Sequence, residues 1–233
     1  MKKIFLLIIF VYSIGLAQTI TFNTLGTWQS NGVPNYLEPV NDIIDASLLS
    51  RVNASLPESQ KVPNHHPNYL SNTTQTNVYL TEECDVWVTF ITEGAGYKNV
   101  LGFYTYQAGN PPTSISDIQN SLTIIFPNAS QSGSGGGLNP GNKVKIGRFS
   151  ANTVIGWFVA ANGFSSATNI TTGNWLLFSD YNLNPQTNVN IKQQNVLLQD
   201  PVTGKLVLGF EDIRRDNGGC DKDFNDVLFN VTA

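Results

Sequence analysis

The residues best suited to chemistry lie near the C-terminus, in the stretch GFEDIRRDNGGCDKDFNDVLF at residues 209–229. Sixteen positions there hold six of the seventeen acidic residues of the chain. Neighbouring carboxylates repel one another by roughly 1 kcal/mol or more each at the dielectric of a protein surface, so a positive group is expected among them. The candidates are a metal ion, the nearby Arg214 and Arg215, or a cationic partner. The six acids are Glu211, Asp212, Asp216, Asp221, Asp223 and Asp226.

The spacing DxDxND at residues 221–226 favours a hard cation such as calcium. Alternate side chains of a tight loop present carboxylate and amide oxygens around such an ion. A regular strand would instead turn Asp226 away from Asp221 and Asp223 and toward the core, so we expect a curled loop. The stretch is not an EF-hand, because the sixth position from Asp221 is Asp226 rather than Gly and the twelfth is Thr232 rather than Glu.

The alternative is that this stretch is only a turn. Asp, Asn and Gly form turns readily, so RRDNGGCD would make a hairpin loop in any case. Asp223 and Asp226 would then cap backbone amides, while Arg214 or Arg215 would neutralise the remaining acids. The charge balance favours the ion, because six acids face three bases when Lys222 is counted with the two arginines.

Side chains outside this stretch contribute less. Glu93, in the turn TEGAGYKN, approaches the acidic loop if the two are neighbours, and is otherwise an ordinary turn residue. His65 and His66 are expected in a surface loop rather than as a metal pair, because adjacent side chains point in different directions. Trp28 and Tyr97 are flanked by polar residues and are the aromatic residues best placed for exposed stacking. The expected calcium ligands are Asp221, Asp223, Asn225, Asp226, Glu211, Asp212 and Glu93.

The N-terminus MKKIFLLIIFVYSIGLAQ has the pattern of a secretory signal peptide. Lys2 and Lys3 precede a short apolar run, and small residues lead to an expected cleavage site between Ala17 and Gln18. The apolar run is too short to span a membrane. We therefore expect residues 1–17 to be removed and the protein to be secreted, periplasmic or on the surface of a bacterial cell.

Charge and cysteine content bear on the partners and the compartment. The net charge of −4 becomes more negative when the two lysines of the signal peptide are removed, which argues against nucleic acid or anionic lipid as a partner. An extracellular glycan or protein of unknown identity is expected instead.

Cys84 and Cys220 are the only cysteines, and export favours a disulfide between them. The alternative is two unpaired thiols.

The composition predicts a β-rich protein with many turns, because the chain has 41% hydrophobic and only 13% charged residues together with 20 glycines. One helix is expected within VNDIIDASLLSRVN at residues 40–53, with Asn41 as its cap. Its apolar face would hold Ile43, Ile44, Leu48, Leu49 and Val52. Strands are expected at residues 19–22, 77–80, 84–92, 99–107, 121–128, 143–149, 153–162, 175–179, 188–200, 205–212 and 226–231.

Many short strands without intervening helices favour an all-β fold. We expect an antiparallel β-sandwich or jelly-roll-like domain over residues 76–233. The preceding segment, residues 18–75, is expected to pack its one helix on the sandwich.

Several blocks of this sequence resemble a known bacterial family. VTFITEGAGYKNVLGFYTY, IIFPNAS, GGGLNPGNKVKIGRF, VIGWFVAANG, VLLQD and LVLGFEDIRRDNGGCDKDFNDVLFNV are similar to successive blocks of domain of unknown function 4114. The resemblance covers residues 77–232. It implies a β-sandwich with a calcium-binding, cell-surface or adhesive role and no catalysis. Family members often carry a His shortly before the VLL block, and KQQNVLLQD has none.

Three classes of function follow. The favoured one is an exported calcium-binding β-sandwich that binds a surface, glycan or protein without catalysis. The second is a calcium-dependent, lectin-like carbohydrate-binding protein. The third is a glycan hydrolase that uses paired carboxylates. An enzyme is disfavoured, because the sequence has no nucleophile elbow, no HExxH motif and no catalytic triad with a usable His.

Overall fold

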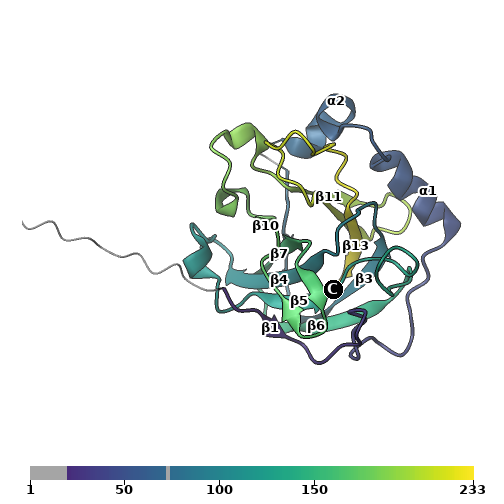
Figure 1. Cartoon of the computed structure of the whole chain (residues 1–233). Helices are drawn as coiled ribbons and strands as arrows, with labels where there is room; N and C mark the ends of the chain where they lie inside the picture. The colour runs from purple at the N-terminus through teal and green to yellow at the C-terminus, as the bar shows by residue number, and fades with distance from the viewer. Residues whose placement is uncertain (1–19, 72–73) are drawn as a thin grey trace, which may run out of the picture.

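The computed structural model of the chain describes residues 20–71 and 74–233. Two sheets form a sandwich in which the strand pairs are antiparallel except for the parallel pair of β1 and β5, and this confirms the predicted fold class (Figure 1). The first sheet has the order β1-β5-β4-β7-β10, with β2 also paired to β7, and the second has the order β11-β12-β13-β3-β6. A separate hairpin consists of β8 and β9. The predicted signal peptide lies outside the described residues.

From residue 84 onward every expected strand overlaps a strand of the structure, but the strands at 164–166 and 169–170 were not expected. The expected strand at 84–92 coincides with β3, which spans Cys84–Thr92. The other strands are β1 (Asn23–Thr24), β2 (Val78–Tyr79), β4 (Val100–Gln107), β5 (Thr123–Phe126), β6 (Lys143–Phe149), β7 (Thr153–Ala161), β8 (Phe164–Ser166), β9 (Asn169–Ile170), β10 (Trp175–Phe178), β11 (Asn195–Gln199), β12 (Leu206–Phe210) and β13 (Val227–Thr232).

The core lies between the two sheets. Trp157 on β7 packs against Phe229 on β13, with ring centroids 5.3 Å apart, and Phe210 on β12 stacks on the same Phe229 at 6.4 Å. All three side chains are fully buried. Alternate residues of β13 therefore point into the sandwich, while Leu228 points to the outer face of the second sheet, where it packs under a helix.

That helix is α1 (Ala46–Ser55), and Figure 1 shows α1 and α2 (Val62–His65) on the side of the sandwich formed by β11 and β13. Leu48 and Val52 of α1 pack against apolar side chains of the second sheet. Short 3-10 turns occur at Pro67–Leu70, Ile115–Asp117, Tyr181–Leu183 and Val189–Ile191. No helix in the part of the chain that the structure describes has the length and apolar character needed to cross a membrane.

Three expectations about secondary structure were wrong in their boundaries. The helix begins at Ala46, because Asp45 rather than Asn41 provides the cap by accepting a hydrogen bond from the Leu48 amide at 2.7 Å. Ile43 therefore lies outside the helix and is 83% exposed. The expected strand at 188–200 is shorter, since residues 189–191 form a 3-10 turn before β11. Residues 23–24, not 19–22, form the first described strand.

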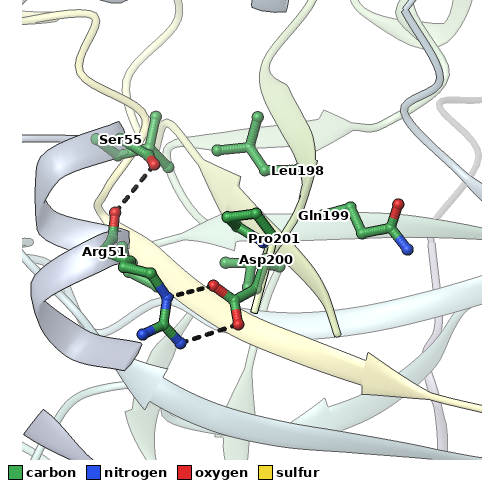
Figure 2. Close-up of a pocket in the computed structure, with 9 residues that line it drawn as sticks. Arg51, Ser55, Leu198, Gln199, Asp200 and Pro201 are labelled. Carbon is green, nitrogen blue, oxygen red and sulfur yellow. Dashed lines mark hydrogen bonds and ion pairs between the residues drawn. The ribbon is translucent and has the colours of Figure 1, made fainter. Parts of the chain in front are cut away.

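An ion pair fixes α1 to the second sheet. Figure 2 shows Arg51 on α1 reaching Asp200, the residue after β11, with two parallel contacts. The Arg51 Nε and Nη2 donate to the two Asp200 carboxylate oxygens at 2.6 and 3.0 Å. The Asp200 side chain is 2% exposed and that of Arg51 is 26% exposed. The Arg51 guanidinium therefore holds the pKa of Asp200 well below its usual range.

We expect Arg51→Met to lower the melting temperature at neutral pH, because it leaves the buried Asp200 carboxylate unpaired. A lowered native pKa stabilises the fold above the unfolded Asp pKa of about 3.9, and that contribution is lost as the pH falls further. The deficit of the variant should therefore shrink below about pH 4. Thermal unfolding of the variant and the wild type at several pH values measures this difference in melting temperature. Arg148→Met is the control, because its pair with Glu83 is 58% and 59% exposed and its contact with Asp85 is long, at 3.7 Å, so both contribute little. Equal melting of both variants would contradict the assignment.

Candidate cation site

The acidic stretch forms the loop between β12 and β13. It curls because Lys222 and Phe224 adopt left-handed backbone conformations, with φ of 68° and 61°. Such a conformation costs an L-residue with a side chain roughly 1–2 kcal/mol. Phe224 offsets part of this cost by burying its ring completely in the cluster under α1. Asp223 lies between these two residues, and Asp221 and Asp226 flank them, so the two turns bring the three acidic side chains close together.

Two overlapping groups of carboxylates result. Glu211, Asp221 and Asp226 form the first group, and Glu58, Asp221 and Asp223 form the second. In each group the three residues offer oxygen atoms that lie within 4.8 Å of one another. Calcium binds oxygens at about 2.3–2.6 Å, so its ligands lie up to about 5 Å apart. Both groups therefore have the dimensions of a calcium site, and Asp221 belongs to both.

Glu211 lies at the buried end of the first group. Its side chain is fully buried, its Oε1 accepts a hydrogen bond from the Phe224 amide at 2.7 Å, and its Oε2 accepts one from the Cys220 thiol at 2.6 Å. Burial raises the pKa of Glu211 to about 7. The folded loop therefore disfavours the negative charge on Glu211 unless a cation compensates for the lost hydration.

Asp212 and Asp226 add a second pair of crowded carboxylates. The Asp212 amide donates to Asp226 Oδ2 at 2.8 Å, and Asn99 Nδ2 donates to Asp212 Oδ2 at 2.8 Å. Burial, followed by the charge of Asp212, raises the pKa of Asp226 far above the usual range. Burial also raises the pKa of Asp212. Without a cation, these two groups are ionised together only at a high cost.

The second group joins the acidic loop to the segment after α1. Ser59 donates its amide hydrogen to Asp223 Oδ2 at 2.7 Å, and the Val62 amide donates to the carbonyl of Lys222 at 2.8 Å. Asn225 Nδ2 also donates to the Leu56 carbonyl at 3.3 Å. These contacts bring Glu58 to the site, although no spacing in the sequence connects it to residues 221–226. Burial raises the pKa of Asp223 to about 6.

The basic residues of the loop do not neutralise these groups. Arg214 pairs with Asp216 through two contacts of 2.5 and 3.0 Å, which takes Asp216 out of the cluster. Arg215 is buried, donates to the Gln193 carbonyl at 3.0 Å and lies over the Phe224 ring. Among the described residues, no ion pair joins Arg215 or Lys222 to an acid. The turn alternative is met in part, because Asp223 and Asp226 accept hydrogen bonds from the Ser59 and Asp212 amides and Arg214 pairs with Asp216. Within the described residues, however, no ion pair reaches Glu211, Asp212 or Asp221.

Glu93 is near the site but not within either group. Its Oε2 accepts a hydrogen bond from the Ala95 amide at 2.8 Å, so its side chain folds back onto its own turn. The turn itself touches the acidic loop, because the Gly94 amide donates to the Asn225 carbonyl at 3.1 Å. The structure thus brings the β3–β4 turn to the site and leaves Glu93 at its margin. His65 and His66 belong to neither carboxylate group.

Comparison with known families finds a match that includes the acidic loop. Residues 149–233 match the family model of a domain of unknown function, DUF4114. This confirms the resemblance over those residues, which include the whole loop and exclude Glu58 and Glu93. No curated protein and no solved structure matches the chain.

The DUF4114 segment does not form either sheet alone. It contributes β7 and β10 to the first sheet and β11, β12 and β13 to the second. Its central partners come from earlier in the chain, since β4 pairs with β7 and β3 pairs with β13. The acidic loop of the DUF4114 segment is therefore completed by residues that precede the segment.

The predicted disulfide is wrong. Cys84 and Cys220 are both free thiols. Cys84 is the first residue of β3. The acidic loop, which contains Cys220, leads into β13, and Leu228 near the start of β13 pairs with Thr92, the last residue of β3. The two cysteines thus lie toward opposite ends of a nine-residue strand. A strand of that length separates them far beyond the 4.4–6.8 Å Cα distance of a disulfide.

We expect both thiols to react with an alkylating reagent when the protein is denatured without a reductant. In the native protein Cys84, which is partly exposed, should react before Cys220. Cys220 is 7% exposed and donates to Glu211, and burial raises the pKa of its thiol. Intact mass measured over a time course follows both reactions. A denatured protein that takes up no label before reduction would contradict the free thiols of the structure.

Proposed function

We propose that this protein is an exported calcium-binding β-sandwich that binds a partner at or outside the bacterial cell surface without catalysis. The observation that supports it most is the pair of carboxylate groups around Asp221, which no arginine or lysine of the loop neutralises. Export rests on the N-terminal sequence pattern, and a binding role rests on the resemblance to DUF4114.

The ligand chemistry favours calcium over other metals. Every member of the two groups is a carboxylate. The side-chain oxygen of Asn225 lies beside Gly94, as Glu58 Oε2 does, so an amide oxygen is near the second group. Zinc and copper sites use imidazole or thiolate ligands. The one thiol nearby, Cys220, is held protonated by burial. Magnesium requires near-ideal octahedral geometry and keeps several waters, whereas calcium tolerates an irregular, carboxylate-rich loop.

The arrangement favours binding over hydrolysis. Glycosidases place two carboxylates on either side of a sugar bond, about 5–9.5 Å apart. Here the acids are gathered around common points, with oxygens within 4.8 Å of one another. Glu211, which has the raised pKa expected of a general acid, is fully buried and already accepts two hydrogen bonds. Because its side chain is not exposed, Glu211 is not positioned to protonate a substrate.

Calorimetric titration of the mature protein with calcium tests the proposal directly. After treatment with a chelator, the protein should bind calcium with a measurable heat and bind magnesium much more weakly. The Asp216→Asn variant is the matched control, because Asp216 pairs with Arg214 and should not affect binding. Absence of binding at millimolar calcium would refute the proposal.

A further inference from the structure

A pocket opens beside the candidate cation site. One side is the β3–β4 turn, from Gly94 to Tyr97, and the other side includes Asp212, Asp221 and Asp226. Two of the three acids of the first carboxylate group thus line the pocket. Calcium takes six to eight oxygen ligands, so three residues leave positions for other oxygens. A ligand in this pocket with hydroxyl groups would lie next to those positions.

The turn side of the pocket is aromatic and open. Tyr97 is partly exposed, and its ring lies 6.5 Å from that of Trp175 on β10, at an interplanar angle of 40°. The Ser130 hydroxyl donates to the Tyr97 carbonyl at 3.4 Å, which holds this residue in place. A Cβ atom built on Gly96 would meet no other atom within 4 Å. The pocket therefore offers an aromatic surface with free space beside a group of hydrogen-bond acceptors.

The charge of the pocket selects among ligands. Asp212, Asp221 and Asp226 line it, and Glu211 lies in the same carboxylate group. The four acids together carry more negative charge than one divalent cation neutralises, so the pocket remains negative when calcium is bound. An anionic ligand would be repelled, whereas a neutral one with many hydroxyl groups would not.

We propose that this pocket binds a neutral carbohydrate, with sugar hydroxyls next to the cation at Asp221 and Asp226 and a sugar ring against Tyr97. The inference rests on the proposed function, because it uses the bound ion. It names the class of partner that the binding module recognises. Sugars combine an apolar ring face with hydroxyl groups, which matches the aromatic and acidic sides of the pocket.

Two glycines provide a matched pair of variants for the test. Gly96 lines the pocket, and Gly218 lies in the exposed part of the acidic loop outside it. Neither has a left-handed φ, and a Cβ atom at either meets no other atom within 4 Å, so both accept a side chain. Gly96→Leu would fill the pocket without altering a carboxylate, and Gly218→Leu is the control. Tyr97→Ala removes the aromatic surface, and Tyr97→Phe retains it.

The experiment measures binding to an array of neutral glycans, built from mannose, galactose, fucose, glucose and N-acetylglucosamine, and of glycans containing uronic acids. Calcium binding is titrated separately for each variant. We expect the wild type, Gly218→Leu and Tyr97→Phe to bind neutral glycans in calcium and to lose them in a chelator. Gly96→Leu and Tyr97→Ala should lose at least about tenfold in glycan affinity and keep their calcium affinity.

Several results would overturn the inference. Calcium binding without any glycan binding would refute the carbohydrate pocket and leave the proposed function intact. Glycan binding that persists in the chelator, prefers uronic acids, or is equal in Gly96→Leu and Gly218→Leu would also refute it. If calcium does not bind, the proposed function fails, and the inference fails with it.

Discussion

The melting temperature of the protein should rise by about 5–10 °C in saturating calcium, relative to protein in a chelator. An ion that binds only the folded state adds about 2.7 kcal/mol of stability at a hundredfold excess over Kd. For a domain of 150–250 residues, each kcal/mol raises the melting temperature by roughly 2–4 °C. The physical source is relief of the burial and repulsion that raise the pKa values of Glu211, Asp223 and Asp226.

Differential scanning calorimetry with calcium, with magnesium and with a chelator measures this effect. Magnesium at the same concentration controls for ionic strength and should produce a much smaller shift. Identical melting in calcium and chelator would contradict the cation site. A shift equally large in Asp221→Asn would show that the ion binds elsewhere.

Asp221→Asn should weaken calcium binding more than Asp223→Asn or Asp226→Asn. Asp221 contributes to both carboxylate groups, whereas each of the other two contributes to one. Asn keeps the shape of Asp but removes its charge, so we expect a loss of at least about tenfold for each single-group residue and more for Asp221. Glu58→Gln should resemble Asp223→Asn, because both belong to the second group.

Calorimetric titration of these variants distinguishes a ligand from a turn residue. If the acids only cap backbone amides, Asn is nearly as good a cap as Asp, and calcium affinity should not change. In a chelator, the Asp→Asn variants should melt at or above the temperature of the wild type, because a repelling charge is gone. Calcium affinity equal to that of Asp216→Asn in all of them would contradict the site.

The strands were largely predictable from the sequence, because a local pattern determines them. The apolar run at residues 84–92 is bounded by turn residues, and β3 has the same bounds. The start of the helix was less predictable, since Asn41 and Asp45 are both good caps. Asp45 is used because the helix that follows it buries Leu48 and Val52 under the second sheet. That burial depends on the complete fold, which no local pattern contains.

The acids within residues 221–226 were predictable for a similar reason, because one tight loop brings them together. Glu58 was not, because it reaches Asp221 only through the packing of the segment after α1 on the loop. The partners of the two arginines could not be predicted from the sequence either: Arg214 pairs with Asp216, and Arg215 donates to the Gln193 carbonyl. The disulfide was predicted from the even number of cysteines and the expected export of the protein. Neither observation gives the distance between the two cysteines in the fold.

Each sheet joins a block of strands that begin before residue 149 to a block of strands from residues 149–233, and this has a consequence for how the module can be transferred between proteins. Excision of residues 149–233 would leave β7 without β4 and β13 without β3, and both strands would then expose unpaired backbone groups along their edges. Such open edges invite aggregation rather than folding. The unit that recombination can move intact therefore begins well before the segment that matches the family model, and a protein that carries the acidic loop must also supply the strands that pair with it.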